Sequence, residues 1–357
     1  MISTFIESGS IPTEKALINQ QWISGGIVVK GRELISYGES AGKSGLAIPG
    51  FVDLQVNGHG GVDLLVAKSA DEIRKLSRSL YANGVIAYLP TLITGPQDVS
   101  LAALKLIEEV RKNPLPGEAQ IIGTHLEGPF ISPAKSGMHP VKYIKDPDKS
   151  FIGEFLRAGK ISQVTIAPEL PGALELIKFL TDSGVVVSLG HSNATAAQAH
   201  AGFDAGAKTV THLWNAMKKK SEGEPGLAQV ALERDDVMIQ LIIDEVHLDS
   251  QLVIDSLKQC PGRFIVTNDA VSAAGIGEGV FPFGEIEIKV ENGKATRMDG
   301  TLAGGVGTLD KSLKLMWEYG VGLEDAIDSV TSRPADLMGM GHLGRLDLGS
   351  PAQILTL

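Results

Sequence analysis

Short apolar runs of β type recur along the chain, and from about residue 51 they alternate with segments whose apolar positions repeat every three or four residues. The β-type runs are GFVDLQV, GVIAYLPTL, AQIIGTH, SQVTIAP, VVVSLG, KTVTHL, VMIQLII and RFIVTN. Between the earlier runs lie amphipathic helical patterns such as DEIRKLSRSLYANG, DVSLAALKLIEEVRKN and PGALELIKFLTDSG. Eight strands that alternate with helices over roughly 220 residues predict a (β/α)8 TIM-like barrel.

An open doubly wound sheet is the alternative architecture, because it also holds many parallel strands. Its dinucleotide-binding form carries a GxGxxG turn after the first strand, and DLQVNG lacks one. Ligands of such a sheet collect where the strand order reverses, whereas the ionisable residues of this chain follow several different strands. The barrel is therefore favoured.

The two chain ends differ from the middle of the chain in that their β-prone runs do not alternate with helical patterns. Residues 1–48 include ALINQQWISGGIVVKGRELISYGES, in which short β-prone runs alternate with Gly pairs as in a small antiparallel sheet. Residues 336–357 end in LGRLDLGSPAQILTL, which is also β-prone. We therefore predict a small β-sandwich-like domain formed by 1–48 and 336–357, with the barrel, 49–335, inserted between its two parts. Within the barrel domain, FGEIEIKVENGKATR predicts a β-hairpin that turns at Asn292-Gly293.

Composition narrows the class of protein. The 357 residues are 43% hydrophobic and 21% charged, which is typical of a globular protein. A net charge of −10 argues against nucleic acid as a partner. No stretch approaches the ~20 apolar residues of a membrane span, and the N-terminus does not resemble a secretory signal. The single Cys260 excludes an internal disulfide and fits a reducing compartment. We expect a cytoplasmic protein that does not bind membranes.

Ionisable side chains follow five of the β-type runs. They are Glu127, His191, His212, His247 and Asp269. Because the carboxyl ends of parallel strands meet at one rim of a barrel, these side chains are expected to converge. Glu127, His191 and His212, after the third, fifth and sixth runs, make the two-imidazole, one-carboxylate set of a hydrolytic metal site. In a closed barrel Asp269, after the eighth run, can face this site as a proton carrier.

Each residue taken alone also has a structural explanation. Glu127 precedes Gly128-Pro129 and suits a turn, and Asp269 suits a helix N-cap. The metal hypothesis therefore rests on the combination. His139 and His247 are predicted to bind substrate or to polarise a carbonyl group.

The first strand predicts how many metals bind. Metal-dependent hydrolases on barrels often begin with His-x-His, which holds a second metal, and here the comparable stretch has Gln55 and Asn57. Neutral amides are poor ligands beside imidazole, so we predict one divalent metal. Zinc is favoured, and iron, manganese or cobalt also fit this ligand set.

Eight motifs occur in a fixed order: PGFVDLQVNGHGG, THLEGPFI, KSGMHP, LGHSNAT, THLWNAM, EPGL, NDAVSAAG and DGTLAGG. Together they resemble the N-acetylglucosamine-6-phosphate deacetylase family of the amidohydrolase superfamily. The motifs span 49–305, and the flanking β-prone segments fit the small second domain of that family. The resemblance implies hydrolysis of the acetamide of N-acetylglucosamine 6-phosphate to glucosamine 6-phosphate and acetate.

The resemblance also implies roles for individual residues. Metal ligands match Glu127, His191 and His212, the catalytic acid/base matches Asp269, the carbonyl-polarising residue matches His139, and substrate-binding positions match His247, Asn215 and Ala216. The last two would meet the phosphorylated end of the sugar through their backbone. The family further implies one metal per subunit and a homodimer.

One position departs from the family pattern. Members carry Arg just before Glu-Pro-Gly, where it reaches the substrate phosphate of the neighbouring subunit, and here the residue is Gly223. Glycine cannot replace a bidentate Arg–phosphate contact. Lys218, Lys219 and Lys220 could supply positive charge, unless they form a solvated loop. Two alternatives therefore stay open: a deacetylase of another N-acetylated amino sugar, with or without phosphate, and a catalytically silent homologue that binds an amino sugar.

Overall fold

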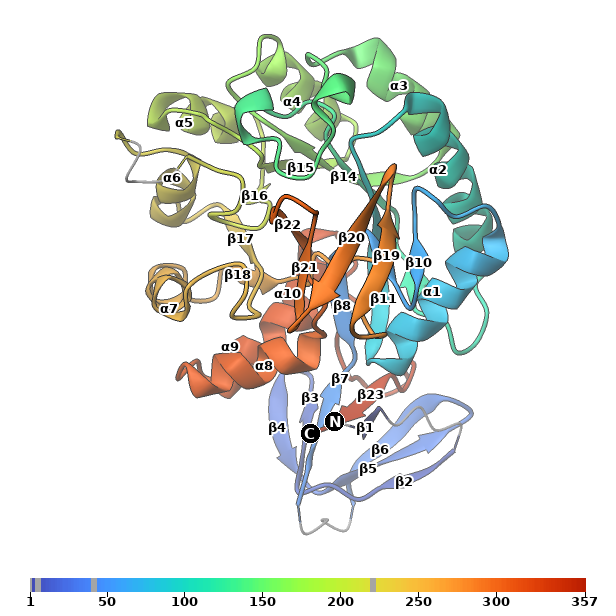
Figure 1. The fold of residues 1–357 in the computed structure, drawn as a ribbon. Coiled ribbons are helices and arrows are strands. Elements are labelled where there is room, and N and C mark those ends of the chain that lie inside the picture. Colours follow the sequence, from blue (N-terminus) through green and yellow to red (C-terminus); the bar gives the residue numbers. More distant parts are fainter. Residues whose placement is uncertain (1, 4–7, 40–43, 219–222) are drawn as a thin grey trace.

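The computed structural model describes residues 2–3, 8–39, 44–218 and 223–357 (Figure 1). Eight parallel strands surround the centre of the molecule in chain order. They are β8 (Phe51–Val56), β11 (Val85–Ile93), β13 (Thr124–Glu127), β14 (Ile161–Ile166), β15 (Val186–Leu189), β16 (Thr209–Val210), β17 (Met238–Leu241) and β18 (Phe264–Val266). This arrangement confirms the predicted (β/α)8 barrel.

The barrel closes between its last and first strands just beyond the end of β18. Val56 of β8 forms an isolated parallel bridge with Ala270. The backbone N–H groups of Asn57 and Gly58 donate to the carbonyl oxygen of Ala270 at 2.8 and 3.0 Å. The segment that follows the eighth strand therefore lies beside the end of the first strand, as expected for Asp269.

Helices cover the outside of the barrel (Figure 1). They are α1 (Ala70–Ala82), α2 (Gln97–Lys112), α3 (Lys149–Ala158), α4 (Ala173–Asp182), α5 (Ala196–Asp204), α6 (Leu227–Glu233), α7 (Ser250–Gln259), α8 (Leu309–Glu318), α9 (Leu323–Val330) and α10 (Ser332–Leu337). In α1 the buried Ile73, Leu76 and Leu80 recur at helical spacing. The hydroxyl of Ser69 accepts the Glu72 N–H and caps this helix.

The third predicted strand is broken in the structure. AQIIGTH gives a short β12 (Gln120–Ile121) and then β13, both paired with β11. Gly123 lies between them with φ of +150°, and a Cβ there would stand 1.9 Å from the Ser162 hydroxyl oxygen. The break redirects the chain so that Glu127 ends the strand at the rim of the barrel.

An antiparallel sheet is inserted after the eighth strand and stands over the mouth of the barrel (Figure 1). Its strands are β19 (Gly279–Phe283), β20 (Ile286–Glu291), β21 (Lys294–Thr296) and β22 (Leu302–Gly304). The hairpin predicted at Asn292-Gly293 is confirmed, because Glu291 pairs with Lys294 across these two residues. The same mouth is bordered by β9 (Gly58–His59), by β10 (Val62–Asp63), which contacts β19, and by the short 3-10 helices η1 (Pro133–Lys135) and η2 (Val141–Tyr143).

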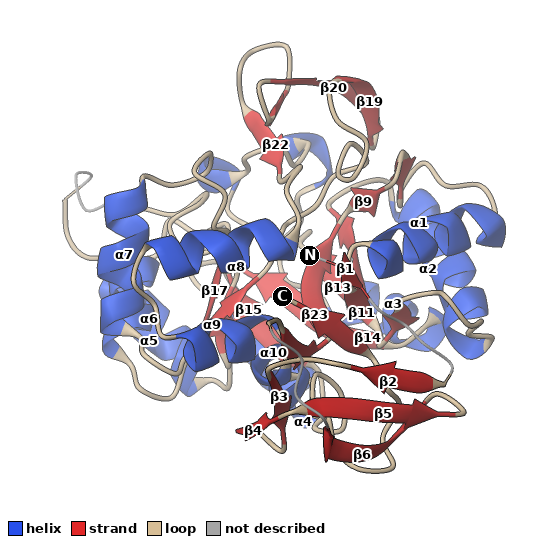
Figure 2. Ribbon diagram, turned by 90° about the horizontal axis from the view of Figure 1, so that it is seen from below, coloured by secondary structure: helices blue, strands red, loops and turns tan. Residues whose placement is uncertain are grey.

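Two small sheets pack below the barrel (Figures 1 and 2). One contains β1 (Ile2–Ser3), β23 (Ile354–Thr356), β7 (Leu46–Pro49), β3 (Lys15–Ile18) and β4 (Gln21–Ser24), and the other contains β2 (Gly9–Ile11), β5 (Gly26–Lys30) and β6 (Glu33–Glu39). Ile18, Ile27 and Leu34 are buried between them. The predicted boundary at 336 falls inside α10, which packs against β8. None of the helices in the described ranges has the length and apolarity to cross a membrane.

Candidate active site

The barrel strands bring the predicted metal ligands and Asp269 to one rim. Glu127 is the last residue of β13, while His191, His212 and Asp269 lie in the segments that follow β15, β16 and β18. His191, His212 and Asp269 all have left-handed backbones, with φ of 47°, 30° and 49° in that order. Residues other than glycine rarely adopt this conformation, and it is concentrated where a structure must aim a functional side chain.

Glu127, His191 and His212 form a tight triangle of possible ligand atoms. Oε1 of Glu127 lies 3.2 Å from Nε2 of His191 and 2.9 Å from Nε2 of His212, and the two Nε2 atoms are 3.1 Å apart. The three side chains are almost completely buried. Burial alone would raise the pKa of Glu127, but the two imidazoles hold it well below its usual value. The acid is therefore a carboxylate.

The tautomer of His191 fits a metal ligand. Nδ1 of His191 lies 2.8 Å from the carbonyl oxygen of Lys135, which can only accept a hydrogen bond. When a cation replaces the proton on Nε2, this contact keeps the other proton of His191 on Nδ1 and leaves the lone pair of Nε2 directed at Glu127 and His212. The lone pairs of His191 Nε2 and Glu127 Oε1 then face one another at 3.2 Å, an arrangement that a cation between them stabilises. A hydrogen bond from the other ring nitrogen to a backbone carbonyl, as His191 makes to Lys135, is usual for metal-binding histidine.

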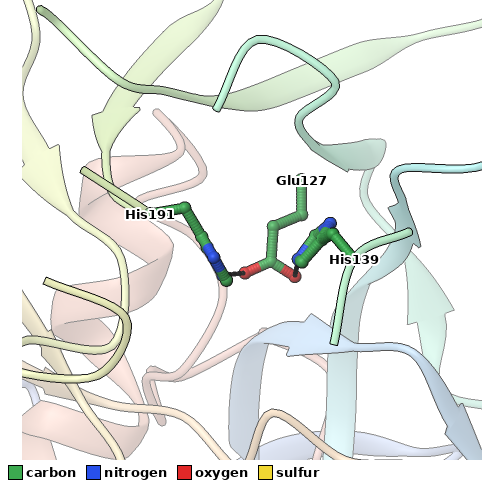
Figure 3. Close-up of side chains that lie close together, drawn as sticks. All are labelled: Glu127, His139 and His191. Atoms are coloured by element: carbon green, nitrogen blue, oxygen red, sulfur yellow. Dashed lines mark hydrogen bonds and ion pairs between the residues drawn. The ribbon is translucent and has the colours of Figure 1, made fainter. Parts of the chain in front are cut away.

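His139 stands on the other side of Glu127 (Figure 3). Its Nε2 is 3.8 Å from Oε2 of Glu127, and the possible ligand atoms of Glu127, His139 and His191 lie within 4.8 Å of one another. By distance alone His139 is therefore a rival ligand. However, the backbone N–H of Thr94 donates to Nδ1 of His139 at 3.2 Å, so neutral His139 carries its proton on Nε2. Burial lowers the pKa of His139 to about 3, so this residue is a neutral hydrogen-bond donor toward the mouth.

Asp269 lies across the mouth from His139. Its Oδ1 accepts a hydrogen bond of 2.6 Å from the amide of Asn57. Burial and the charge of Glu127 raise the pKa of Asp269 to about 8. The amide of Gln55 donates in the same way to Oε1 of Glu127 at 3.0 Å. Each of the two amides of the first strand therefore holds a carboxyl group of the site.

These side chains open into one cavity of about 400 Å³. The predicted site residues that line it are Glu127, His139, His191, His212, Asn215, Ala216, His247 and Asp269. Asn215, Ala216 and His247 form a polar side of the cavity. Nδ1 of His247 pairs with Oδ2 of Asp244 at 2.7 Å, which leaves Nε2 for a ligand. Asp244 Oδ1 also accepts the backbone N–H of His247, so one carboxylate holds both the backbone and the imidazole of this residue.

Of the three predicted phosphate contacts, Lys218 alone belongs to the described residues. Lys218 does not line the cavity, and Lys219 and Lys220 lie outside the described residues. Lys135 is the single Lys or Arg residue on the described wall. The sequence offered a signal for it, because Lys135 belongs to the segment that carries His139. Thr94 and Asp244 were also missed: Thr94 directly follows β11, and Asp244 stands three residues before His247.

Comparison with known proteins agrees with this geometry. The amidohydrolase family model matches residues 46–357. N-acetylgalactosamine-6-phosphate deacetylase of Escherichia coli O157:H7 is 32% identical over 87% of this chain and 83% of its own length. N-acetylglucosamine-6-phosphate deacetylase of Caenorhabditis elegans is 35% identical over 87% of this chain and 78% of its own length.

Solved structures of N-acetylglucosamine-6-phosphate deacetylases are also similar to this chain. A mutant N-acetyl-D-glucosamine-6-phosphate deacetylase from Mycobacterium smegmatis, in complex with N-acetyl-D-glucosamine-6-phosphate, superimposes with a TM-score of 0.90 at 29% identity, over 99% of this chain and 95% of that one. The deacetylase from Pasteurella multocida gives a TM-score of 0.89 at 29% identity, over 98% and 95%. The chain therefore belongs to the amidohydrolase family, as a relative of the N-acetylglucosamine-6-phosphate deacetylases.

Proposed function

We propose that this protein hydrolyses the acetamide of N-acetylglucosamine 6-phosphate to glucosamine 6-phosphate and acetate. The observation that carries the proposal is one cavity whose wall brings together the Glu127–His191–His212 triangle, a neutral donor, His139, and a carboxyl group, Asp269. A binding protein needs neither this ligand set nor a proton carrier beside it. The catalytically silent alternative is therefore disfavoured.

Glu127, His191 and His212 are proposed to hold one divalent metal. The fit rests on the chemistry of the donor set and on the Nδ1 contact of His191, which frees Nε2. When bound there, the metal supplies Lewis-acid activation of water and of the amide carbonyl. Zinc suits a two-imidazole, one-carboxylate set, and iron, manganese and cobalt are compatible with it.

Two side chains are proposed to handle the substrate. His139 donates its Nε2–H to the acetamide oxygen and stabilises the negative charge that develops there. In its ionised form, Asp269 takes a proton from the attacking water and passes it to the amide nitrogen, so that the C–N bond breaks with a neutral amine as the leaving group. The hydrogen bond from Asn57 keeps Asp269 oriented during both transfers.

The sugar phosphate is proposed to lie toward Asn215, Ala216 and His247. Lys135, at the same cavity, can provide charge that Gly223 lacks. Relatives of similar identity are named as deacetylases of N-acetylglucosamine 6-phosphate and of its galactose epimer, so both sugars are test substrates.

The buried Cys260 supports a cytoplasmic location. The family precedent supports a homodimer, which light scattering would test.

The decisive experiment measures acetate release by the zinc-loaded protein from N-acetylglucosamine 6-phosphate, N-acetylgalactosamine 6-phosphate and unphosphorylated N-acetylglucosamine. Preference for the first substrate supports the proposal. Preference for the second moves the function to the other epimer. Equal rates with and without phosphate would favour the alternative that Gly223 raised, a deacetylase of unphosphorylated sugars. No acetate from any of the three would contradict a deacetylase function for this site.

A further inference from the structure

A second cavity lies directly beside the active site. It has a volume of about 310 Å³, and its apolar lining includes Leu65, Val99 and Ile286. The inserted sheet, the segment around η2 and the residues from Thr94 to Val99 line it together. Glu285 joins the inserted sheet to the segment around η2, because its carboxylate pairs with Lys142 at 2.9 Å and accepts the Tyr143 hydroxyl at 2.8 Å. The space is thus already formed in the folded protein.

Ile93, Met138 and Phe283 separate the two cavities. Each of them lines both spaces, and all three belong to one buried apolar cluster. They come from different parts of the fold: Ile93 ends β11, Phe283 ends β19 and Met138 lies between η1 and η2. We call these three side chains the apolar wall. Met138 is the one member with a flexible, unbranched side chain.

The wall lies next to the group that would hold the amide carbonyl. Met138 directly precedes His139, and Ile93 directly precedes Thr94, whose N–H fixes His139. An amide whose oxygen meets His139 and whose nitrogen meets Asp269 has one substituent left on its carbonyl carbon, the acyl chain. Since the polar residues Asn215 and His247 suit the sugar, the acyl chain is left to the apolar side.

We propose that the apolar wall sets the length of the N-acyl group that the enzyme removes, and that Met138 closes the way to a second cavity able to take a longer acyl chain. The inference rests on the proposed function and adds a specificity device to it. The reaction is unchanged: water adds to the acyl carbon, the C–N bond breaks, and the products are a fatty acid and the amino sugar phosphate.

The test compares glucosamine 6-phosphate carrying N-acetyl, N-propanoyl, N-butanoyl or N-hexanoyl groups. In the wild type each added methylene should lower kcat/KM by roughly tenfold, because a packed pocket rejects extra volume. In Met138→Ala the cavities join, and each methylene that enters the apolar space should raise kcat/KM by roughly fourfold. N-hexanoyl has four more methylenes than N-acetyl, so the ratio of N-hexanoyl to N-acetyl hydrolysis should rise by about a millionfold when all four enter the apolar space and by about a thousandfold when two do.

Leu302→Ala is the matched control, because Leu302 lines the active-site cavity but not the second one. This variant enlarges the first cavity alone, so it should leave the N-hexanoyl substrate excluded. Phe283→Ala, on a different element, serves as the second variant should Met138→Ala not fold, and it should give the same shift.

The outcomes separate the two hypotheses. Wild-type cleavage of the N-acetyl substrate with an unchanged chain-length profile in Met138→Ala and Phe283→Ala overturns the wall and leaves the deacetylase function intact. The same profile change in Leu302→Ala as in Met138→Ala also overturns it. Failure of the wild type on every N-acyl sugar phosphate overturns the proposed function, and the wall with it.

Discussion

The backbone N–H of Thr94 donates to Nδ1 of His139 at 3.2 Å, and this contact decides which nitrogen of the imidazole faces the active site with a proton. The Thr94 hydroxyl lies 2.9 Å from the same nitrogen and 3.1 Å from the carbonyl oxygen of Glu127. Thr94 thus links His139, the proposed hydrogen-bond donor to the substrate carbonyl, to the strand that carries Glu127, the proposed carboxylate ligand. His139 is distinguished from a metal ligand by its hydrogen bonds and not by its position.

His139→Ala should therefore lose activity without losing metal. Removal of one oriented donor to a developing oxyanion costs roughly a hundredfold to a thousandfold in kcat. The metal content of the purified variant, measured by plasma mass spectrometry, should equal that of the wild type. A variant that is purified without metal would make His139 a ligand instead.

His191→Ala should lose the metal. Its Nε2 lies 3.1 Å from Nε2 of His212, and Nδ1 is fixed by the Lys135 carbonyl, so alanine removes an oriented side chain that we propose as a ligand. Both metal content and activity should fall to background after dialysis against a chelator and reloading with one equivalent of zinc. Full metal occupancy in this variant would contradict the ligand assignment.

Asp269→Asn should separate proton transfer from metal binding. Asparagine has nearly the same shape but cannot accept a proton, so kcat should fall by roughly a hundredfold to ten-thousandfold. Zinc content and the melting temperature should stay close to those of the wild type, because Asp269 is not one of the three proposed ligands. Activity within twofold of the wild type would remove this residue from the mechanism.

Asp53 should make the metal-free protein less stable as the pH rises. It is completely buried, which raises its pKa from 3.8 to about 6 although Thr267 donates to Oδ1 at 2.6 Å. The folded protein therefore binds this proton more tightly than the unfolded chain, and stability is lost as pH rises from about 4 to about 6. The expected loss is about 3 kcal/mol in the free energy of unfolding.

Asp53→Asn tests this, because asparagine keeps the Oδ1 acceptor but does not ionise. Urea unfolding of both chelator-treated proteins at several pH values across this window gives the measurement. The difference in the free energy of unfolding between wild type and variant should change with pH and level off above the pKa of Asp53 in the folded protein. A constant difference would show that Asp53 has an ordinary pKa in the folded protein.

Cys260 should be unreactive while the protein is folded. Burial raises the pKa of its thiol to about 11, and Sγ donates to the carbonyl oxygen of Ser256 at 3.1 Å. At mildly alkaline pH an aromatic disulfide reagent should release no chromophore from the native protein and one equivalent from the protein in concentrated guanidinium chloride. Rapid reaction in the native state would show that the C-terminal end of α7 opens.

The sequence by itself determined the barrel and the positions along it of the residues proposed to hold the metal. Alternation of β-type runs with helical patterns requires parallel strands, and parallel strands of one barrel share a rim at their carboxyl ends. Residues that directly follow such runs, such as Glu127 and His212, therefore meet without any knowledge of their contacts. The hairpin at Asn292-Gly293 was equally local, since its turn depends on two adjacent residues.

Only the tertiary structure decided the protonation pattern and the shape of the cavity. Which nitrogen of His139 or His191 bears the proton depends on Thr94 and Lys135, which lie 45 and 56 residues away. The wall made by Ile93, Met138 and Phe283 likewise joins three elements that are distant in the chain. Hydrogen bonds and packing between distant segments leave no periodic trace in a sequence, because they depend on how the elements are placed in space.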